Sequence, residues 1–167
     1  MNRDPRIDKM AHILARHSLK IQKDDRVLID ATDECDELIV AMLERIREIG
    51  AVPYVQHQSL RVRRTWLLGA TPAQFDLWYE QQVSLRQKMD CILSLRGQDN
   101  CCELIDVPAE TMRTYTNLNI NIGMNARKPG RRSTVIRYPS RSLAQQSGMS
   151  LEAFTDLFYR VCAMNYE

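Results

Sequence analysis

The residues best placed to do chemistry in this chain lie in two short polar stretches. Thr32 and Asp33 follow one apolar run, and Arg96 and Asn100 follow another. If both runs are parallel strands, their carboxyl ends meet at one edge of a sheet, where open α/β sheets bind ligands. There Arg96 would hold a carboxylate while Thr32 and Asn100 position a polar group. The alternative is that these are ordinary cap and turn residues, and the sequence alone favours it.

Other recognisable chemistries are missing. None of the six glycines forms a G-x-G-x-x-G or P-loop pattern, so no backbone cradle for phosphate is expected. His12 and His17 are five residues apart, about 140° around a helix, and do not share a face. His57 has no His or Cys neighbour in the sequence. The five cysteines lack C-x-x-C spacing, which favours reduced, mostly buried thiols.

A run of acidic residues surrounds the expected start of the second helix. Its members are Asp30, Asp33, Glu34, Asp36 and Glu37. They could bind a cation or act as an acid–base pair, but the helix dipole already explains acidic residues at a first turn. A dinuclear metal centre also needs histidines and bridging carboxylates from several elements. We therefore expect no catalytic residue, no metal ligand and no cofactor in this chain.

Positive charge is concentrated in one stretch. No acidic residue occurs between Thr111 and Leu151, and that stretch holds seven basic residues, namely Arg113, Arg127, Lys128, Arg131, Arg132, Arg137 and Arg141. Such segregation predicts a partner of opposite charge. The candidates for docking on an acidic domain are Arg127, Arg131, Arg132 and Arg137. Solvated surface is the alternative, because exposed charges often contribute little.

Nucleic acid is the disfavoured partner. The arginines are not interleaved with exposed aromatic side chains, and the sequence pI of about 8.3 is below that of most basic footprints. The aromatic residues Phe75, Trp78 and Tyr79 are interpreted as core rather than as a base-stacking platform.

Helices and strands alternate along the chain and would position these residues. Short apolar runs that indicate strands occur at residues 26–31, 52–57, 91–95 and 133–138. Helical patterns lie between them, at residues 5–18, from Thr32 or Asp33 to Gly50, at 62–68, from Pro72 through Val83, and from Pro108 past Tyr115. A further turn at 141–147 precedes a final helix.

Several helix ends can be assigned from single residues. Asp4 is an N-cap followed by proline, and Ser150 caps the final helix. Thr71 and Gln74 have the spacing of a capping box. Gly50 stands where a helix ends in the left-handed conformation.

The alternation predicts a single α/β domain over residues 1–167, a mostly parallel sheet with helices on both faces in a Rossmann-like, three-layer arrangement. Hydrophobic content of 44% and charged content of 26% fit a globular protein. No apolar run reaches the ~20 residues of a membrane span, and no secretory signal is visible. We expect a cytoplasmic protein without a membrane partner.

Several motifs resemble one family. Residues 138–154 read Y-P-S-x-x-L-A-Q-Q-S-G-M-S-L-E-A-F, and Y-R-x-C follows at 159–162. Upstream, residues 4–7, 18–21, 26–29 and 92–100 match in the same order. Together they resemble the N-terminal domain of the thermophilic aminopeptidases, leucyl-type dinuclear metallopeptidases.

The resemblance implies a non-catalytic domain. In that family the metal ligands for two zinc or cobalt ions lie in a C-terminal catalytic domain, which has no counterpart here. This chain would shape the cleft for a peptide substrate and contact the catalytic domain, and we expect it to be inactive alone. Two alternatives remain: the N-terminal domain of a related iron-dependent dihydroxypyridine dioxygenase, and a stand-alone interaction module. A homodimer is a further candidate assembly.

Overall fold

Four parallel strands form the centre of the molecule in the computed structural model, which describes residues 3–162. Their order is β2-β1-β3-β4. Their bounds are Arg26–Asp33 for β1, Val52–Gln58 for β2, Cys91–Gly97 for β3 and Arg132–Arg137 for β4. The order reverses between β1 and β3, which is the switch point where ligands bind in open α/β sheets.

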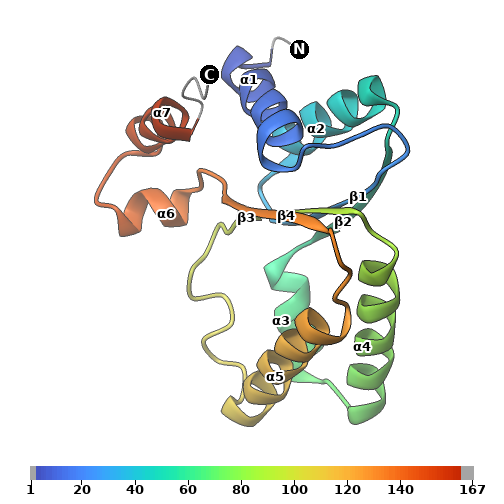
Figure 1. Cartoon of the computed structure of the whole chain (residues 1–167). Coiled ribbons are helices and arrows are strands. Elements are labelled where there is room, and N and C mark those ends of the chain that lie inside the picture. Colours follow the sequence, from blue (N-terminus) through green and yellow to red (C-terminus); the bar gives the residue numbers. More distant parts are fainter. Residues whose placement is uncertain (1–2, 163–167) are drawn as a thin grey trace.

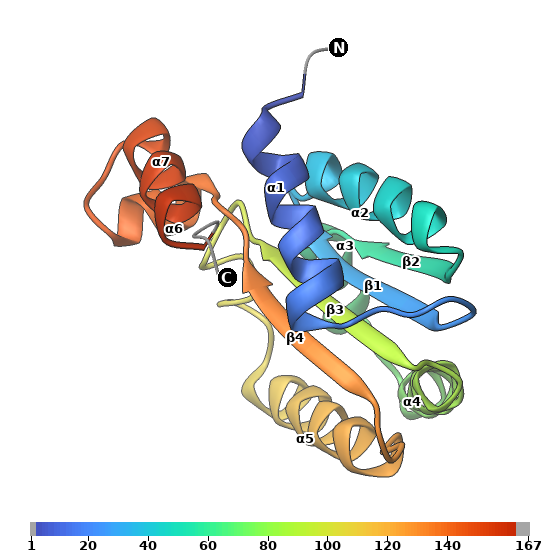
Figure 2. The same cartoon turned by 45° about the horizontal axis from the view of Figure 1, so that its top comes forward.

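Helices cover both faces of this sheet, as the sequence predicts (Figures 1 and 2). On the upper face of Figure 1 lie α1 (Pro5–Ile13), continued by a π-helical segment (Leu14–Ser18), and α2 (Asp36–Ile49). On the lower face lie α3 (Leu60–Leu68), α4 (Pro72–Gln87) and α5 (Ala109–Asn125). Beyond β4, α6 (Arg141–Gln146) and α7 (Leu151–Cys162) stand beside α1. No helix within residues 3–162 has the length and apolarity to cross a membrane.

The predicted helix ends are confirmed where the capping residue lies at the end of the helix that it caps. Thr71 Oγ1 accepts from the Gln74 N–H at 3.3 Å, and Gln74 Oε1 accepts from the Thr71 N–H at 2.9 Å. Ser150 Oγ accepts from a first-turn N–H of α7 at 3.2 Å. Gly50 ends α2 with φ of 80°, a conformation that costs glycine little.

One predicted helix start is wrong. Neither Thr32 nor Asp33 caps α2, because both belong to β1, which runs two residues past the predicted end. Cys35 occupies the N-cap position of α2, and its side chain makes no capping hydrogen bond. Asp33, at φ of 52°, turns its carboxylate to α3 instead and accepts from the Leu60 N–H at 2.7 Å. Pairing of Asp33 with Gly97 keeps it in the sheet, so a tertiary ladder overrides the local cap.

The two faces of the sheet differ in chemistry. The upper face is apolar along its length, with Val27, Ile29 and Ala31 of β1 fully buried against α1 and α2. On the lower face, Leu28 and Ile92 pack on the end of α4. Further along the strands the lower-face positions become polar.

A separate apolar cluster lies farther from the sheet, between the lower helices. It contains Leu67, Phe75 and Val107, with Trp66 and Tyr115 packed against it. A polar layer therefore separates the lower helices from the carboxyl half of the sheet.

Candidate functional site

The two polar stretches meet at one edge of the sheet, as parallel strands require. Thr32 pairs with Arg96 and Asp33 with Gly97 in the ladder between β1 and β3. The carboxyl ends of these strands therefore lie together, and the predicted convergence of the two loops at this edge is confirmed.

The four predicted pocket residues do not line one pocket, however. Arg96 points under the sheet, where its guanidinium donates to the Asp30 carbonyl at 2.9 Å and to Asp30 Oδ2 at 3.1 Å. Thr32 is only 3% exposed. Asp33 and Asn100 instead line a hollow beyond the strand ends. The division arises because successive strand residues face opposite sides, and because Asp33, the last residue of β1, has a positive φ.

This hollow, of about 590 Å³, is rich in carboxylates. The acidic residues that line it are Asp33, Glu34, Asp36, Asp99 and Glu103, against one arginine, Arg61. Their combined charge favours a cationic group over an anion. The carboxylate-binding role predicted for Arg96 therefore does not belong to this hollow.

Cap and turn bonds account for both predicted residues in the hollow. The Asp33 carboxylate holds the start of α3. Asn100 Oδ1 accepts from the Cys102 N–H at 2.9 Å, and its Nδ2 donates to Glu103 Oε2 at 3.0 Å. Asn100 thus acts as a turn residue, as the alternative interpretation predicts, whereas Asp33 satisfies a backbone group of α3 rather than of the helix that follows it.

His57 is the site residue that sequence reasoning left out. It is the second-last residue of β2 and lines the hollow, and its Nε2 lies 2.6 Å from the Asp33 carbonyl oxygen. Its Nδ1 lies 3.6 Å from Asp36 Oδ1, close enough to form an ion pair if the ring is protonated. Its position at the end of a strand was the available signal, since strand ends of one parallel sheet converge. Among residues 3–162, no group of three or more His, Cys, Asp or Glu side chains is arranged to hold a metal ion.

The four arginines predicted to dock a partner divide into two pairs. Arg131 donates to the carbonyls of Arg86 at 2.7 Å and Ala126 at 2.5 Å. Arg132 donates to the Lys20 carbonyl at 2.5 Å and to Asp25 Oδ2 at 2.8 Å. These two guanidinium groups hold the fold together.

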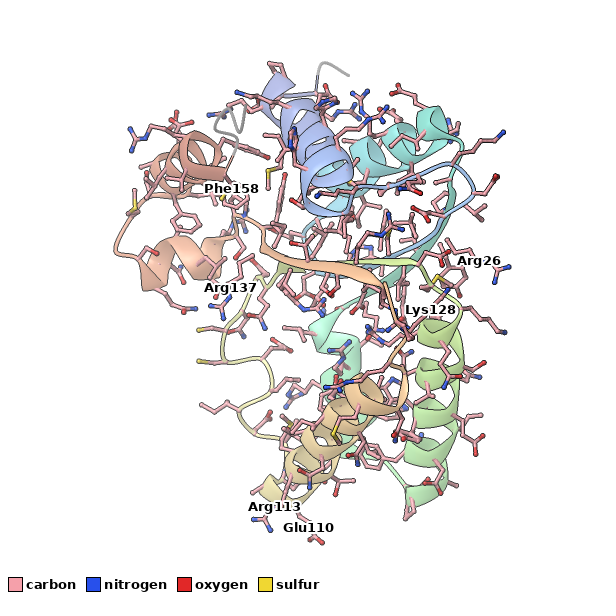
Figure 3. All side chains as sticks on the ribbon, viewed as in Figure 1. Arg26, Glu110, Arg113, Lys128, Arg137 and Phe158 are labelled. Atoms are coloured by element: carbon pink, nitrogen blue, oxygen red, sulfur yellow. The ribbon has the colours of Figure 1, made fainter. Side chains whose placement is uncertain are left out.

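Arg127 and Arg137 have exposed side chains. Figure 3 shows Arg137 on the same side of the molecule as α6, far from the tip of α5 where Arg113 and Glu110 lie. Of the four arginines, only Arg127 and Arg137 could bind a partner without losing a side-chain hydrogen bond that the structure describes.

All five cysteines are free thiols, but the prediction that they are mostly buried is wrong, because only two of the five are buried. Cys35 and Cys91 are buried, whereas Cys101 and Cys102 are exposed. Burial raises the pKa of the Cys35 thiol to about 12 and that of Cys91 to about 11, so neither is a nucleophile at neutral pH.

Comparisons with known proteins place this geometry in context. The family model described as thermophilic metalloprotease (M29) matches residues 3–167. Among solved structures, wild-type AmpT from Thermus thermophilus is similar, with a TM-score of 0.72 and 17% identity over 95% of this chain. The chain covers 43% of that structure's length. At this identity the likeness concerns the fold. No curated protein sequence matches the chain.

Proposed function

The chain belongs to the thermophilic metalloprotease family, and from that premise we propose that it is the domain of a metal-dependent aminopeptidase that carries no metal ligands. It shapes the substrate cleft and contacts the catalytic domain. The whole enzyme removes N-terminal residues from peptides. The family match over residues 3–167 carries this proposal, and it favours a peptidase over the dioxygenase alternative.

The family implies a divalent metal, and the residues described in this chain do not fit one. His57 and Asp36 are the nearest approach to a ligand pair, at 3.6 Å, and no third ligand completes a set within residues 3–162. We therefore assign the pair of zinc or cobalt ions to the catalytic domain.

The acidic hollow is the part of this chain that we assign to the cleft. The free α-amino group of a peptide has a pKa of about 7.7–8.0 and is largely protonated at neutral pH. Five carboxylates around one hollow attract that charge and repel the peptide's carboxylate. Such a field orients a peptide with its amino end inward.

Arg137 is the docking residue in this proposal, because Arg127 precedes β4 and lies at the opposite edge of the sheet. A catalytic domain that binds metal ions through carboxylates projects a negative field, and exposed arginines on a neighbouring domain are drawn to it. Arg137 ends β4, so it lies at the carboxyl edge of the sheet, where the acidic hollow also opens. The absence of disulfides among the five cysteines supports a reducing compartment, and we place the protein in the cytoplasm.

Two measurements test the proposal. The chain alone should bind no stoichiometric zinc or cobalt and should not hydrolyse leucyl-p-nitroanilide. Turnover that a chelator abolishes and that survives repurification would contradict the absence of metal ligands.

The second measurement is association with the separately produced catalytic domain, followed by calorimetry. Arg137→Glu should weaken binding several-fold, and Arg113→Glu, at the exposed tip of α5, should leave it unchanged. Equal binding by both variants would exclude Arg137 from the interface. Sedimentation of the chain alone tests the homodimer.

A further inference from the structure

A cavity of about 250 Å³ lies between the lower face of the sheet and the helices α3, α4 and α5. Side chains from every surrounding element line it, among them Asp30 of β1, Arg63 of α3, Arg86 of α4 and Arg96 of β3. Arg131, after α5, completes the ring. The cavity occupies the polar layer that separates the two apolar clusters of the lower face.

Positive charge in this cavity exceeds negative charge. Asp30 is the single acidic residue in the lining, and its side chain is 7% exposed. Its Oδ2 accepts from Arg86 at 3.0 Å and from Arg96 at 3.1 Å, so one carboxylate is shared between two guanidinium groups. Arg63 and Arg131 also line the cavity, so four arginines and one aspartate face it. Guanidinium groups clustered in a partly desolvated space repel one another, and a bound anion would offset that repulsion.

The arginines also keep unused hydrogen-bonding capacity. The Nε of Arg86 is buried and has no partner among the described residues. A buried donor without an acceptor is costly, typically by about 1–3 kcal/mol. The Arg86 and Arg96 side chains are 21% and 36% exposed, so the cavity is open to solvent and a ligand can enter it.

An aromatic hollow adjoins the cavity. It has a volume of about 430 Å³ and shares Arg63, Trp78 and Tyr115 with the cavity. The Trp78 and Tyr115 rings lie 5.2 Å apart, and the Arg63 guanidinium lies 5.7 Å from the Tyr115 ring centre. Trp66 forms a further wall. These rings present flat apolar surface directly beside the arginines.

We propose that this cavity binds a small organic anion. A carboxylate or phosphate group would lie among Arg63, Arg86 and Arg96, where planar guanidinium groups can donate two hydrogen bonds to one anionic head. A flat apolar portion would lie against Trp78 and Tyr115. The space is sufficient, because a cavity of roughly 150 Å³ already accommodates benzene. The acidic hollow lies beyond the strand ends and has the opposite charge, and Gln58 lies on the border between it and the cavity.

Titration of the chain with benzoate, inorganic phosphate and uncharged benzamide at constant ionic strength tests this inference. Trp66 and Trp78 are the only tryptophans of the chain, and both line the aromatic hollow, so intrinsic fluorescence reports directly on it. Benzoate or phosphate should give a saturable change that the other anion competes away, and benzamide should give none. The anion that binds more tightly identifies the head group.

Two variants locate the binding. Arg63→Gln removes a cationic side chain that has no bond to Asp30, and it should weaken anion binding about 10-fold or more while the chain stays folded by circular dichroism. Arg113→Gln, exposed on the far end of α5, is the matched control and should bind like the original chain. A non-saturable response, an equal response to benzamide, or undiminished binding by Arg63→Gln would overturn the proposal.

Discussion

Replacing Gly97 with alanine should destabilise the chain measurably, because the end of β3 presses on the loop after β1. A Cβ at Gly97 would lie 2.5 Å from the Glu34 carbonyl oxygen and 2.6 Å from Cys35 Sγ. The Gly97 carbonyl also accepts from the Glu34 N–H at 3.1 Å, so the two backbones are held together. Relief of the overlap requires a backbone shift rather than a side-chain rotation.

The size of the effect follows from that constraint. Overpacking in well-packed regions costs about 1–3 kcal/mol. With an m-value of about 2 kcal/mol/M in urea, the midpoint of unfolding should fall by roughly 0.5–1.5 M. Urea titration followed by circular dichroism at 222 nm is the assay.

Gly123→Ala is the matched control for this substitution. Gly123 lies within α5, and a Cβ there would meet nothing within 4 Å. Since alanine favours the helix interior by about 0.5–1 kcal/mol, this variant should be neutral or slightly more stable. An unchanged midpoint for Gly97→Ala would refute the close approach of β3 to the loop that carries Glu34 into the acidic hollow.

Three further predictions concern caps and thiols. Thr71→Ala should lower the free energy of unfolding by about 1 kcal/mol in the same urea assay, through loss of the capping box on α4. Under native conditions Ellman's reagent should modify the exposed Cys101 and Cys102 rapidly, and it should modify Cys35 and Cys91 only after unfolding. Rapid reaction of all four thiols in the folded chain would disprove the burial of Cys35 and Cys91. Because burial raises the pKa of Cys35 to about 12, its stabilising contribution is complete below the unfolded thiol's pKa of about 8.5 and is lost as the pH rises above that value. Cys35→Ala should therefore flatten the decline of stability between about pH 8.5 and 11, and an unaltered slope would contradict the raised pKa.

Much of the secondary structure could be predicted because its signals act over a few residues. The Thr71–Gln74 capping box involves atoms within one helical turn, and Gly50 ends α2 through its own backbone freedom. The Ser150 cap depends only on its own first turn. Short apolar runs also located all four strands, with ends displaced by up to two residues. The alternation of strands and helices also predicts that Thr32 and Arg96 lie at one edge of a parallel sheet, and the ladder pairs them.

The candidate site could be predicted only in part, because strand pairing decides which side chains share a space. Asp33 is of a residue type that often caps the helix that follows it. Its pairing with Gly97 instead keeps it in β1, and its carboxylate accepts a hydrogen bond from the Leu60 N–H. Two of the four arginines assigned to a partner, Arg131 and Arg132, already donate hydrogen bonds within the chain. Nothing near Arg131 or Arg132 in the sequence indicates the distant carbonyls that they bind.

The sequence by itself therefore determined the order and type of the elements, several helix ends and the α/β class, since each depends on contacts within a few residues. Only the tertiary structure decided that Arg96 turns under the sheet to Asp30, where Arg86 also donates from α4. Asp30 is separated from Arg86 by 56 positions and from Arg96 by 66. Contacts over such separations depend on strand order, register and the face to which each side chain points, and these are set by the packing of the whole domain.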